Sequence, residues 1–177
     1  MGLSAQVLSG QKPSRLLPVS YSRTPRESLL FGAFERVQVA AVCYRVRRGK
    51  LEFLLVRTRN GHWTFPKGGV DDDPTPADAA AREAYEEAGV KGSVERAAFT
   101  SYKHCKPGEP RSQRRVVMVR AHLCEVQELV TPLEGYRTPT WFRAEKAKRR
   151  LRKCRTAEFA AEIVNVIDHA ARLINRP

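Results

Sequence analysis

Short apolar runs alternate with polar breaks in the first half of the chain, a pattern typical of a β-sheet. Residues 37–46 and 51–58 are rich in Val, Leu, Ala and aromatic side chains, and a polar turn at 47–50 separates them. Two apolar runs joined by so short a break predict a β-hairpin. A third extended piece is expected at 63–65, where Pro66 ends it.

Further strands are expected in the second half of the chain. Apolar residues at 94–102 and 115–126 predict two strands, with a basic loop at 103–114 between them. A last short strand is expected to end at Trp141 and Phe142.

Helical signals occur at three places. Residues 77–88 are dense in good helix formers, Pro76 suits a first turn, and Gly89 suits a C-terminal end. The basic stretch 143–155 is also expected to be helical. Apolar residues recur at helical spacing over 159–174, and we expect this last helix to pack its apolar stripe on the sheet.

Residues 1–34 differ from the rest because they show no sustained periodicity. They are rich in Ser, Arg, Pro and Leu and contain one acidic residue, Glu27. We therefore expect an N-terminal extension or arm, residues 1–34, and one domain, residues 35–177. An Arg-rich and Ser-rich, acid-poor start is also typical of an organellar transit peptide, so this alternative stays open. A cytoplasmic location is expected, because no apolar secretion signal is recognisable.

Length and composition are those of a globular protein. The 177 residues suit one ordinary domain with a short extension, and 42% of them are hydrophobic. No uncharged apolar run approaches the roughly 20 residues of a membrane-spanning helix, so no membrane partner is expected. The four cysteines form no Cys-x-x-Cys pair, which argues against a zinc ribbon or a thioredoxin-type site.

The formal net charge of +13 indicates an anionic partner such as a nucleic acid or a polyphosphate. The charge is uneven along the chain. Residues 61–100 contain 4 basic and 8 acidic side chains, although the protein as a whole is strongly basic. An acidic segment inside a basic protein predicts a cation site.

Three glutamates in this acidic segment share one face of the expected helix. Glu83, Glu86 and Glu87 are spaced i, i+3 and i+4, and neighbouring like charges repel by about 0.2–0.5 kcal/mol per pair. A divalent cation would remove this repulsion, and ligands that are all oxygen favour Mg2+ or Mn2+ over zinc. The alternative is an ordinary solvated acidic face, partly neutralised by Arg82.

The sequence around the glutamates carries a longer pattern. After Gly68 come five residues, Pro74, seven residues, and then Arg-Glu-Ala-Tyr-Glu-Glu-Ala-Gly-Val at 82–90. This resembles the Nudix box, the signature of the Nudix hydrolase family (MutT-like pyrophosphohydrolases). That signature is Gly, five residues, Glu, seven residues, then Arg-Glu-aliphatic-any-Glu-Glu-any-Gly-aliphatic. Residues 63–67 are also similar to the family's run into the box.

The resemblance implies an α/β fold, a Nudix-type α/β/α sandwich with a mixed sheet and a loop-helix-loop catalytic motif. It covers roughly residues 36–173. The implied activity is hydrolysis of a diphosphate linkage with bound Mg2+ or Mn2+, a reaction that depends on charge neutralisation and an aligned water.

The resemblance also implies roles for single residues. Glu86 and Glu87 would be metal ligands, and the backbone carbonyl of Lys67 would be another. Glu83 would be a ligand or the base that activates water, held in place by Arg82.

The chain departs from the box at Pro74, where the family has a glutamate. A neighbouring aspartate at 71, 72 or 73 is the candidate substitute, and we expect Pro74 to weaken the activity. A further acid outside the box often contributes in the family, and the candidates here are Glu125 and Glu134.

Basic and aromatic residues supply candidates for substrate binding. The basic loop would attract a polyphosphate, and a solvated charged loop is an equal alternative. The aromatic rings would either stack on a base or form the core or the cleft wall. The candidates are Lys67, Lys103, His104, Arg115, Trp63 and Tyr102.

A second basic cluster follows at 143–155. It is interpreted either as a contact for RNA, a polyphosphate or another anionic surface, or as a solvated helix. The oligomeric state is not predicted, and a homodimer is one state that the sequence allows.

The function expected first is metal-dependent hydrolysis of a dinucleoside polyphosphate or another nucleoside diphosphate derivative. Diphosphoinositol polyphosphates and RNA 5′ ends are the alternative substrates. A module of the same fold that binds phosphate or RNA without hydrolysis is the alternative from another class, and Pro74 motivates it.

Overall fold

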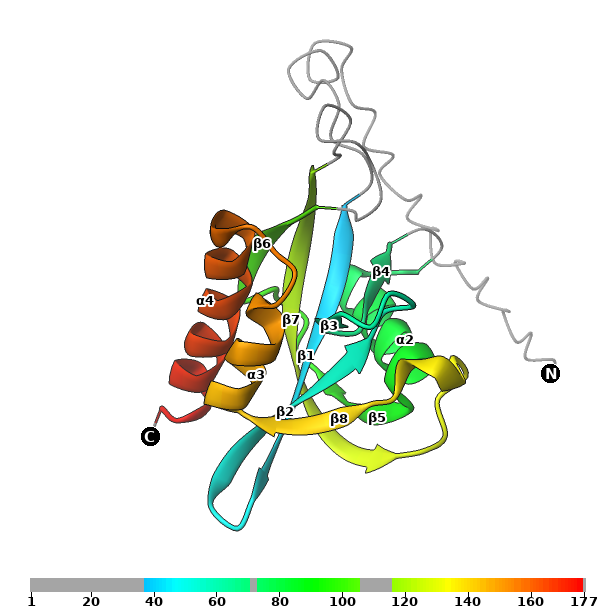
Figure 1. Cartoon of the computed structure of the whole chain (residues 1–177). Helices are drawn as coiled ribbons and strands as arrows, with labels where there is room; N and C mark the ends of the chain where they lie inside the picture. The colour runs from blue at the N-terminus through cyan, green and yellow to red at the C-terminus, as the bar shows by residue number, and fades with distance from the viewer. Residues whose placement is uncertain (1–36, 71–72, 106–115, 177) are drawn as a thin grey trace, which may run out of the picture. The chain divides into compact units, whose positions relative to one another are not determined.

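The computed structural model describes residues 37–70, 73–105 and 116–176. Over these residues an eight-stranded mixed sheet is covered by three α-helices (Figure 1). The strands are β1 (Gln38–Arg47), β2 (Lys50–Arg57), β3 (Trp63–Thr64), β4 (Lys67–Gly69), β5 (Val90–Val94), β6 (Thr100–Cys105), β7 (Val116–Leu129) and β8 (Thr140–Arg143). The helices are α2 (Pro76–Ala88), α3 (Ala144–Arg152) and α4 (Ala157–Ile174), with a short 3-10 helix, η2 (Gly135–Arg137).

Strands β1 and β2 form the predicted hairpin. Arg47 lies opposite Lys50, so only Arg48 and Gly49 make the turn. Both have positive φ, 52° and 68°. This is the conformation of a two-residue type I′ turn, which matches the twist of the strands on either side.

Strand β7 joins the two halves of the sheet. The strand order is β3-β2-β1-β7-β5, with β4 paired to β1, β6 to β7 and β8 to β2. Only the pairing of β1 with β7 is parallel among the described strands. The 14 residues of β7 are long enough to pair with β1, β5 and β6.

The sheet separates two apolar cores, because successive residues of a strand point to opposite faces. Ala40 and Val42 of β1 pack with residues of α3 and α4, whereas Val39 and Ala41 pack with alanines of α2. Helix α2 therefore covers one face and α3 with α4 the other (Figure 1). The predicted α/β class, an α/β/α sandwich around a mixed sheet, is confirmed, and so is the packing of the last helix on the sheet.

The single strand predicted at 94–102 was wrong. Residues 94–102 are not one strand: β5 ends at Val94 and β6 begins at Thr100. The amides of Glu95 and Phe99 donate to the carbonyls of Leu123 and Ala121. The two amides are four residues apart and the two carbonyls only two, so this segment has more residues than a strand paired with β7 would need. The chain leaves the sheet there, which a run of apolar residues does not reveal.

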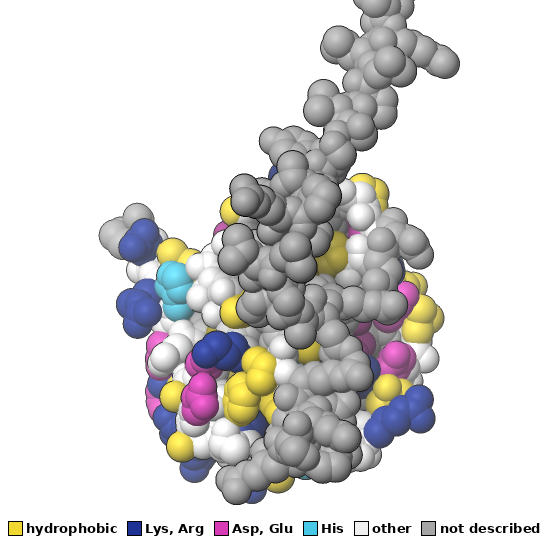
Figure 2. All heavy atoms as spheres, turned by 90° about the horizontal axis from the view of Figure 1, so that it is seen from above, with side chains coloured by type: hydrophobic (Ala, Val, Ile, Leu, Met, Phe, Trp, Pro, Cys, Tyr) yellow, Lys and Arg dark blue, Asp and Glu magenta, His cyan; other side chains and the backbone are white. Residues whose placement is uncertain are grey.

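The expected loop at 103–114 is also corrected at its start, because its first three residues belong to β6. The rest of that loop and the expected extension at 1–34 lie outside the described residues. No helix in the described part of the chain combines the length and the apolar character needed to span a bilayer. In the face seen in Figure 2, Lys and Arg side chains lie in several separate groups with Asp and Glu among them.

Candidate functional site

Helix α2 has well-defined ends. At its N-terminus the Thr75 hydroxyl accepts a hydrogen bond from the Asp78 amide at 3.2 Å, the usual N-cap arrangement. At its C-terminus Gly89 has φ 64° and its amide donates to the Tyr85 carbonyl at 2.9 Å. The positions of the two ends set the rotation of the helix, and thereby the direction in which its glutamates point.

The predicted glutamates meet strand β4. Glu83 and Glu87 are buried, with 8% and 4% of their surface exposed, whereas Glu86 is partly exposed. The Lys67 amide donates to Glu87 Oε2 at 3.2 Å. A Cβ added at Gly68 would overlap the carboxylate of Glu83. The structure therefore brings the three glutamates and Lys67 together, and Gly68 leaves the room that Glu83 fills.

Arg82 links two of these glutamates to the loop that precedes α2. Its Nη1 donates to Glu83 Oε1 at 2.9 Å and to Glu86 Oε2 at 3.1 Å. Its Nε donates to Asp73 Oδ2 at 3.1 Å, and its Nη2 donates to the Gly69 carbonyl at 3.2 Å. Asp73 thus supplies a carboxylate beside Pro74, while Asp71 and Asp72 lie outside the described residues.

Arg137 of η2 is a site residue that the sequence did not reveal. It pairs with Glu87 Oε1 and, through Nε at 2.6 Å, with Glu134 Oε2. The Glu134 amide donates to the Glu86 carbonyl at 3.0 Å, which holds this segment against α2. Fifty positions separate Glu87 from Arg137, so no local spacing could have connected them. Glu125, the other outside candidate, is exposed on β7 opposite Ser93.

Burial dominates the titration of the inner carboxylates. It raises the pKa of Glu87 to about 7, although the positive charges of Arg137 and Lys67 oppose the shift. It also raises the pKa of Glu83, against the opposing charge and hydrogen bond of Arg82. For the Lys67 ammonium the same burial lowers the pKa, and the charge of Glu87 opposes it. The negative charge at this place is therefore poorly solvated and favours a cation partner.

The donor set fits a hard divalent cation. Within the described ranges no group of three or more His, Cys, Asp or Glu side chains converges closely enough to hold a metal ion as it stands. However, Glu83 and Glu86 already direct one oxygen each at the same nitrogen of Arg82. Carboxylate oxygens, with backbone carbonyls nearby, are the ligands that Mg2+ and Mn2+ prefer. The space at Gly68 lets the Glu83 carboxylate lie over β4.

Of the substrate candidates, Lys67 lies with the glutamates, whereas Lys103 and His104 lie in β6. Lys103 lies in β6, where its Nζ is 3.6 Å from Glu162 of α4. His104 follows it in the same strand. Arg115 lies outside the described residues.

The two aromatic candidates are buried. The ring centroids of Trp63 and Phe142 lie 5.0 Å apart in an edge-to-face contact, and those of Tyr102 and Phe65 lie 6.2 Å apart. The Tyr102 hydroxyl is buried and has no hydrogen-bond partner among the described residues. Both rings therefore form part of the core on the side of α3 and α4.

Arg155 is a second residue that the sequence did not single out as part of the site. Its Nη2 donates to the Trp63 carbonyl at 3.0 Å, and its Nη1 donates to the Leu151 carbonyl. Burial lowers the pKa of its guanidinium, and the phenol of Tyr102 opposes the shift. The chain after α3 thus brings a partly buried cation to the backbone of β3.

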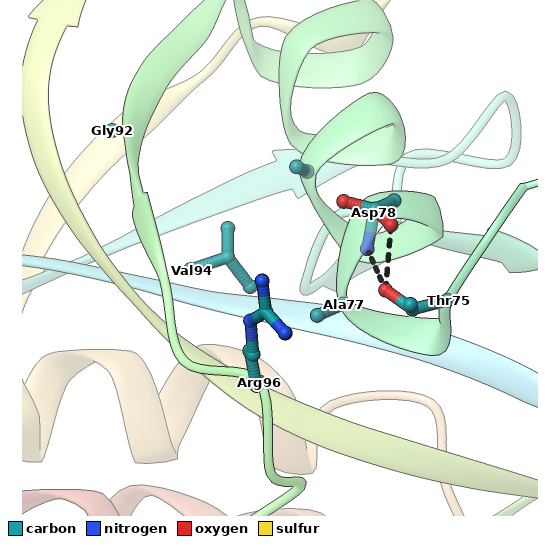
Figure 3. A pocket seen from close by; sticks show the side chains of 7 residues that line it. Thr75, Ala77, Asp78, Gly92, Val94 and Arg96 are labelled. Carbon is teal, nitrogen blue, oxygen red and sulfur yellow. Dashed lines mark hydrogen bonds between the residues drawn. The ribbon is translucent and has the colours of Figure 1, made fainter. Parts of the chain in front are cut away.

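A separate hollow of about 270 Å³ lies at the N-terminal end of α2. The small side chains of Ala77 and Ala81 and the absence of one at Gly92 leave the space. Arg96 projects into it from beyond β5 (Figure 3). Thr75 and Asp78 hydrogen bond to each other there at 2.7 Å. None of the three glutamates lines this hollow, so it is distinct from the glutamate site.

Comparison with known protein families identifies the family of this chain. The family model described as NUDIX domain matches residues 36–163. This segment includes the glutamate site, β1 to β8 and part of α4.

Curated relatives match shorter stretches. Nudix hydrolase 18, mitochondrial, of Arabidopsis thaliana is 39% identical over 83 residues, which cover 42% of this chain and 47% of that protein. Diphosphoinositol polyphosphate phosphohydrolase 2 of Rattus norvegicus is 44% identical over 61 residues, 33% of this chain and 34% of that protein. The chain therefore spans less than half the length of these relatives.

Solved structures share the fold. A binary complex of the Caenorhabditis elegans Ap4A hydrolase has a TM-score of 0.58 at 21% identity and covers 79% of this chain and 98% of its own. The NUDIX domain of Shewanella oneidensis NrtR, complexed with ADP ribose, has a TM-score of 0.59 at 17% identity and covers 86% and 100%.

Proposed function

We propose, from the premise that this chain belongs to the NUDIX domain family, that it is a pyrophosphohydrolase. It hydrolyses a diphosphate linkage in an anionic, phosphorylated substrate and depends on Mg2+ or Mn2+. One observation carries the proposal: two buried glutamates, Glu83 and Glu87, lie against β4, and Arg82 links Glu83 to the partly exposed Glu86.

Glu83, Glu86 and Glu87 would hold the metal, together with the backbone carbonyl of Lys67. The bound metal supplies charge neutralisation at the phosphate oxygens and a more acidic water. Arg82 keeps the carboxylates of Glu83 and Glu86 on the same side of α2. Glu83 is the candidate base, because it is buried and lies over the gap left by Gly68.

A dinucleoside polyphosphate or another nucleoside diphosphate derivative is the substrate that we propose first. The structural neighbour from C. elegans is an Ap4A hydrolase, which supports this class through the fold alone. A diphosphoinositol polyphosphate is the second candidate. It is favoured by the 44% identity to the rat phosphohydrolase over 61 residues, although that match covers 34% of the rat protein.

The test is a panel of substrates with Mg2+ or Mn2+. It contains diadenosine tetraphosphate, ADP ribose, a diphosphoinositol pentakisphosphate and a 5′-triphosphorylated RNA. The Glu86→Gln variant serves as the inactive control, and Glu128→Gln, an exposed carboxylate of β7 paired with Lys91, serves as the matched charge control. We expect turnover of one class that falls at least 100-fold in Glu86→Gln and stays within twofold in Glu128→Gln.

The alternative from another class is a module that binds phosphates or RNA without hydrolysis. No turnover of any panel member, together with binding of one member that is independent of metal, would establish this alternative. A preference for the triphosphorylated RNA would instead move the RNA 5′ end to the first place among the substrates.

A further inference from the structure

Most of the basic side chains of helix α3 take no part in its packing against the rest of the protein. Ala147 and Leu151 of α3 are buried in the core under the sheet, and Lys148 forms ion pairs with Glu145 at 2.5 Å and with Asp168 of α4 at 2.9 Å. The remaining basic side chains gather elsewhere. Three of them, Lys146, Arg149 and Arg150, line a hollow of about 240 Å³ together with Lys153, the residue after the helix.

These four side chains repel one another. Lys146, Arg149 and Arg150 are spaced i, i+3 and i+4 on one face of the helix, and Lys153 follows directly after its last residue, so each has a like charge as a neighbour. Across the part of the chain that the structure describes, none of the four has a carboxylate within ion-pair distance. Nothing described in the protein therefore neutralises the hollow.

The helix dipole does not account for this arrangement. A dipole favours cations in the last turn of a helix, which suits Arg149 and Arg150. Lys146, however, lies in the first turn, where the same dipole disfavours a cation. The ring of Phe142 is buried and lies 5.5 Å from Lys146 Nζ and 5.9 Å from the Arg150 guanidinium, so it keeps two of the cations over one place.

We propose that this hollow is a second binding site, for a compact ligand that carries several phosphate groups, such as a short polyphosphate. Four cations around one small volume suit closely spaced phosphates, each of which can accept hydrogen bonds from Lys or Arg. A single-stranded RNA would instead need a groove that follows its backbone and exposed rings on which its bases stack. The ring that contacts these cations, Phe142, is 5% exposed, so it offers no such surface.

The hollow is distinct from the glutamate site. Helix α3 packs in the core on one face of the sheet, while the glutamates belong to α2 on the other face. Binding in the hollow needs no metal, so it can be measured under conditions where hydrolysis does not occur. Failure of this proposal and failure of the proposed hydrolase activity are therefore distinguishable.

The experiment is a calorimetric titration of the full chain with inorganic tripolyphosphate in the presence of a chelator. The test variant is the double substitution Arg149→Gln and Lys153→Gln, which removes two exposed cations of the hollow. The matched control is Arg143→Gln and Arg152→Gln, which removes the same charge from exposed positions of the same region outside the hollow. We expect the affinity to fall at least tenfold in the test variant and less than threefold in the control.

Equal losses of affinity in the two variants would overturn the proposal, because tripolyphosphate would then be attracted by the overall positive charge of the protein. The absence of any binding by the unmodified protein would overturn it as well. A parallel titration uses a 12-nucleotide single-stranded RNA. Tighter binding of RNA than of tripolyphosphate, lost only in the test variant, would also overturn it and assign the hollow to nucleic acid. Circular dichroism of each variant checks that α3 keeps its helical structure.

Discussion

At the residue scale, Gly68 is the position where the addition of a single methyl group would disturb the glutamate site. Its missing side chain leaves the space that the Glu83 carboxylate occupies over β4. The box signature predicted a glycine here, but its purpose became clear only from the packing. A carboxylate at the end of a flexible side chain can move away. A larger residue at position 68 is therefore expected to lower the activity more than the stability of the fold.

The Gly68→Ala variant is expected to fold but to lose activity. The new methyl group displaces the Glu83 carboxylate, and a misplacement of about 1 Å at a catalytic group costs roughly 100-fold in rate. Steady-state hydrolysis of the substrate found in the panel measures this loss. Gly135→Ala is the control, since a Cβ there meets nothing within 4 Å. Equal rates in the two variants would show that the position of Glu83 is unimportant.

Asp73 is a carboxylate next to Pro74, the position where the box has a glutamate, and it contacts Arg82. It holds the Arg82 guanidinium from the side opposite to Glu83 and Glu86. Of the three aspartates that the sequence offered as substitutes, Asp73 is the one that the structure describes, and it pairs with Arg82.

Asp73→Asn is expected to lower kcat about tenfold and to leave KM nearly unchanged, because Arg82 loses its charged partner and holds the glutamates less firmly. Asp73→Glu should restore part of the rate, since it keeps the charge. Kinetics of both variants, with calorimetric metal binding as a second readout, check this. A normal kcat in Asp73→Asn would exclude a positioning role.

At the scale of the element, α2 depends on its C-terminal glycine. Gly89 has a left-handed backbone, its carbonyl accepts from the Val130 amide at 2.8 Å, and a Cβ there would overlap the Val130 carbonyl. The end of the helix, the start of β5 and the segment after β7 therefore meet at this one residue.

Gly89→Ala is expected to destabilise the protein by about 3 kcal/mol, from a left-handed conformation and an overpacked contact. Gly49→Ala measures the cost of the left-handed conformation alone, because Gly49 also has a positive φ of 68° but open space around it. We expect about 1 kcal/mol there. Urea unfolding of both variants gives the difference, and similar values would mean that the contact with Val130 relaxes freely.

Sequence patterns predicted elements well where the signal was local. The hairpin of β1 and β2, the ends of α2 and the glutamate face all follow from residues within a few positions of one another. The break between β5 and β6 did not, because it depends on which carbonyls of β7 the amides of Glu95 and Phe99 reach. The contacts of Arg137 and Arg155 were not predicted for the same reason, because each residue lies far along the sequence from its partner.

At the scale of the whole molecule, the acidic segment of the sequence becomes a buried acidic place in a basic protein. Two arginines, Arg82 and Arg137, lie among its glutamates. The net charge of +13 therefore does not describe the site, where the carboxylates outnumber the arginines that pair with them.

Saturating Mn2+ is expected to raise the melting temperature by roughly 5–10 °C, because a ligand at 100 times its Kd stabilises the folded state by about 2.7 kcal/mol. Glu86→Gln should lose most of this rise, while Glu128→Gln, an exposed carboxylate paired with Lys91, should keep it. Differential scanning calorimetry with metal and then with a chelator measures both. An equal rise in the two variants would locate the metal elsewhere.

The parallel pairing of β1 with β7 has a consequence for synthesis of the chain. Gln38 pairs with Val119, so about 80 residues must leave the ribosome before the apolar strand β1 finds its neighbour. At roughly 5–20 residues per second, β1 waits for about 4–16 seconds with one edge open. During that interval β1 can pair with β2 and β4 on its other edge, while the edge that β7 will cover stays open to aggregation.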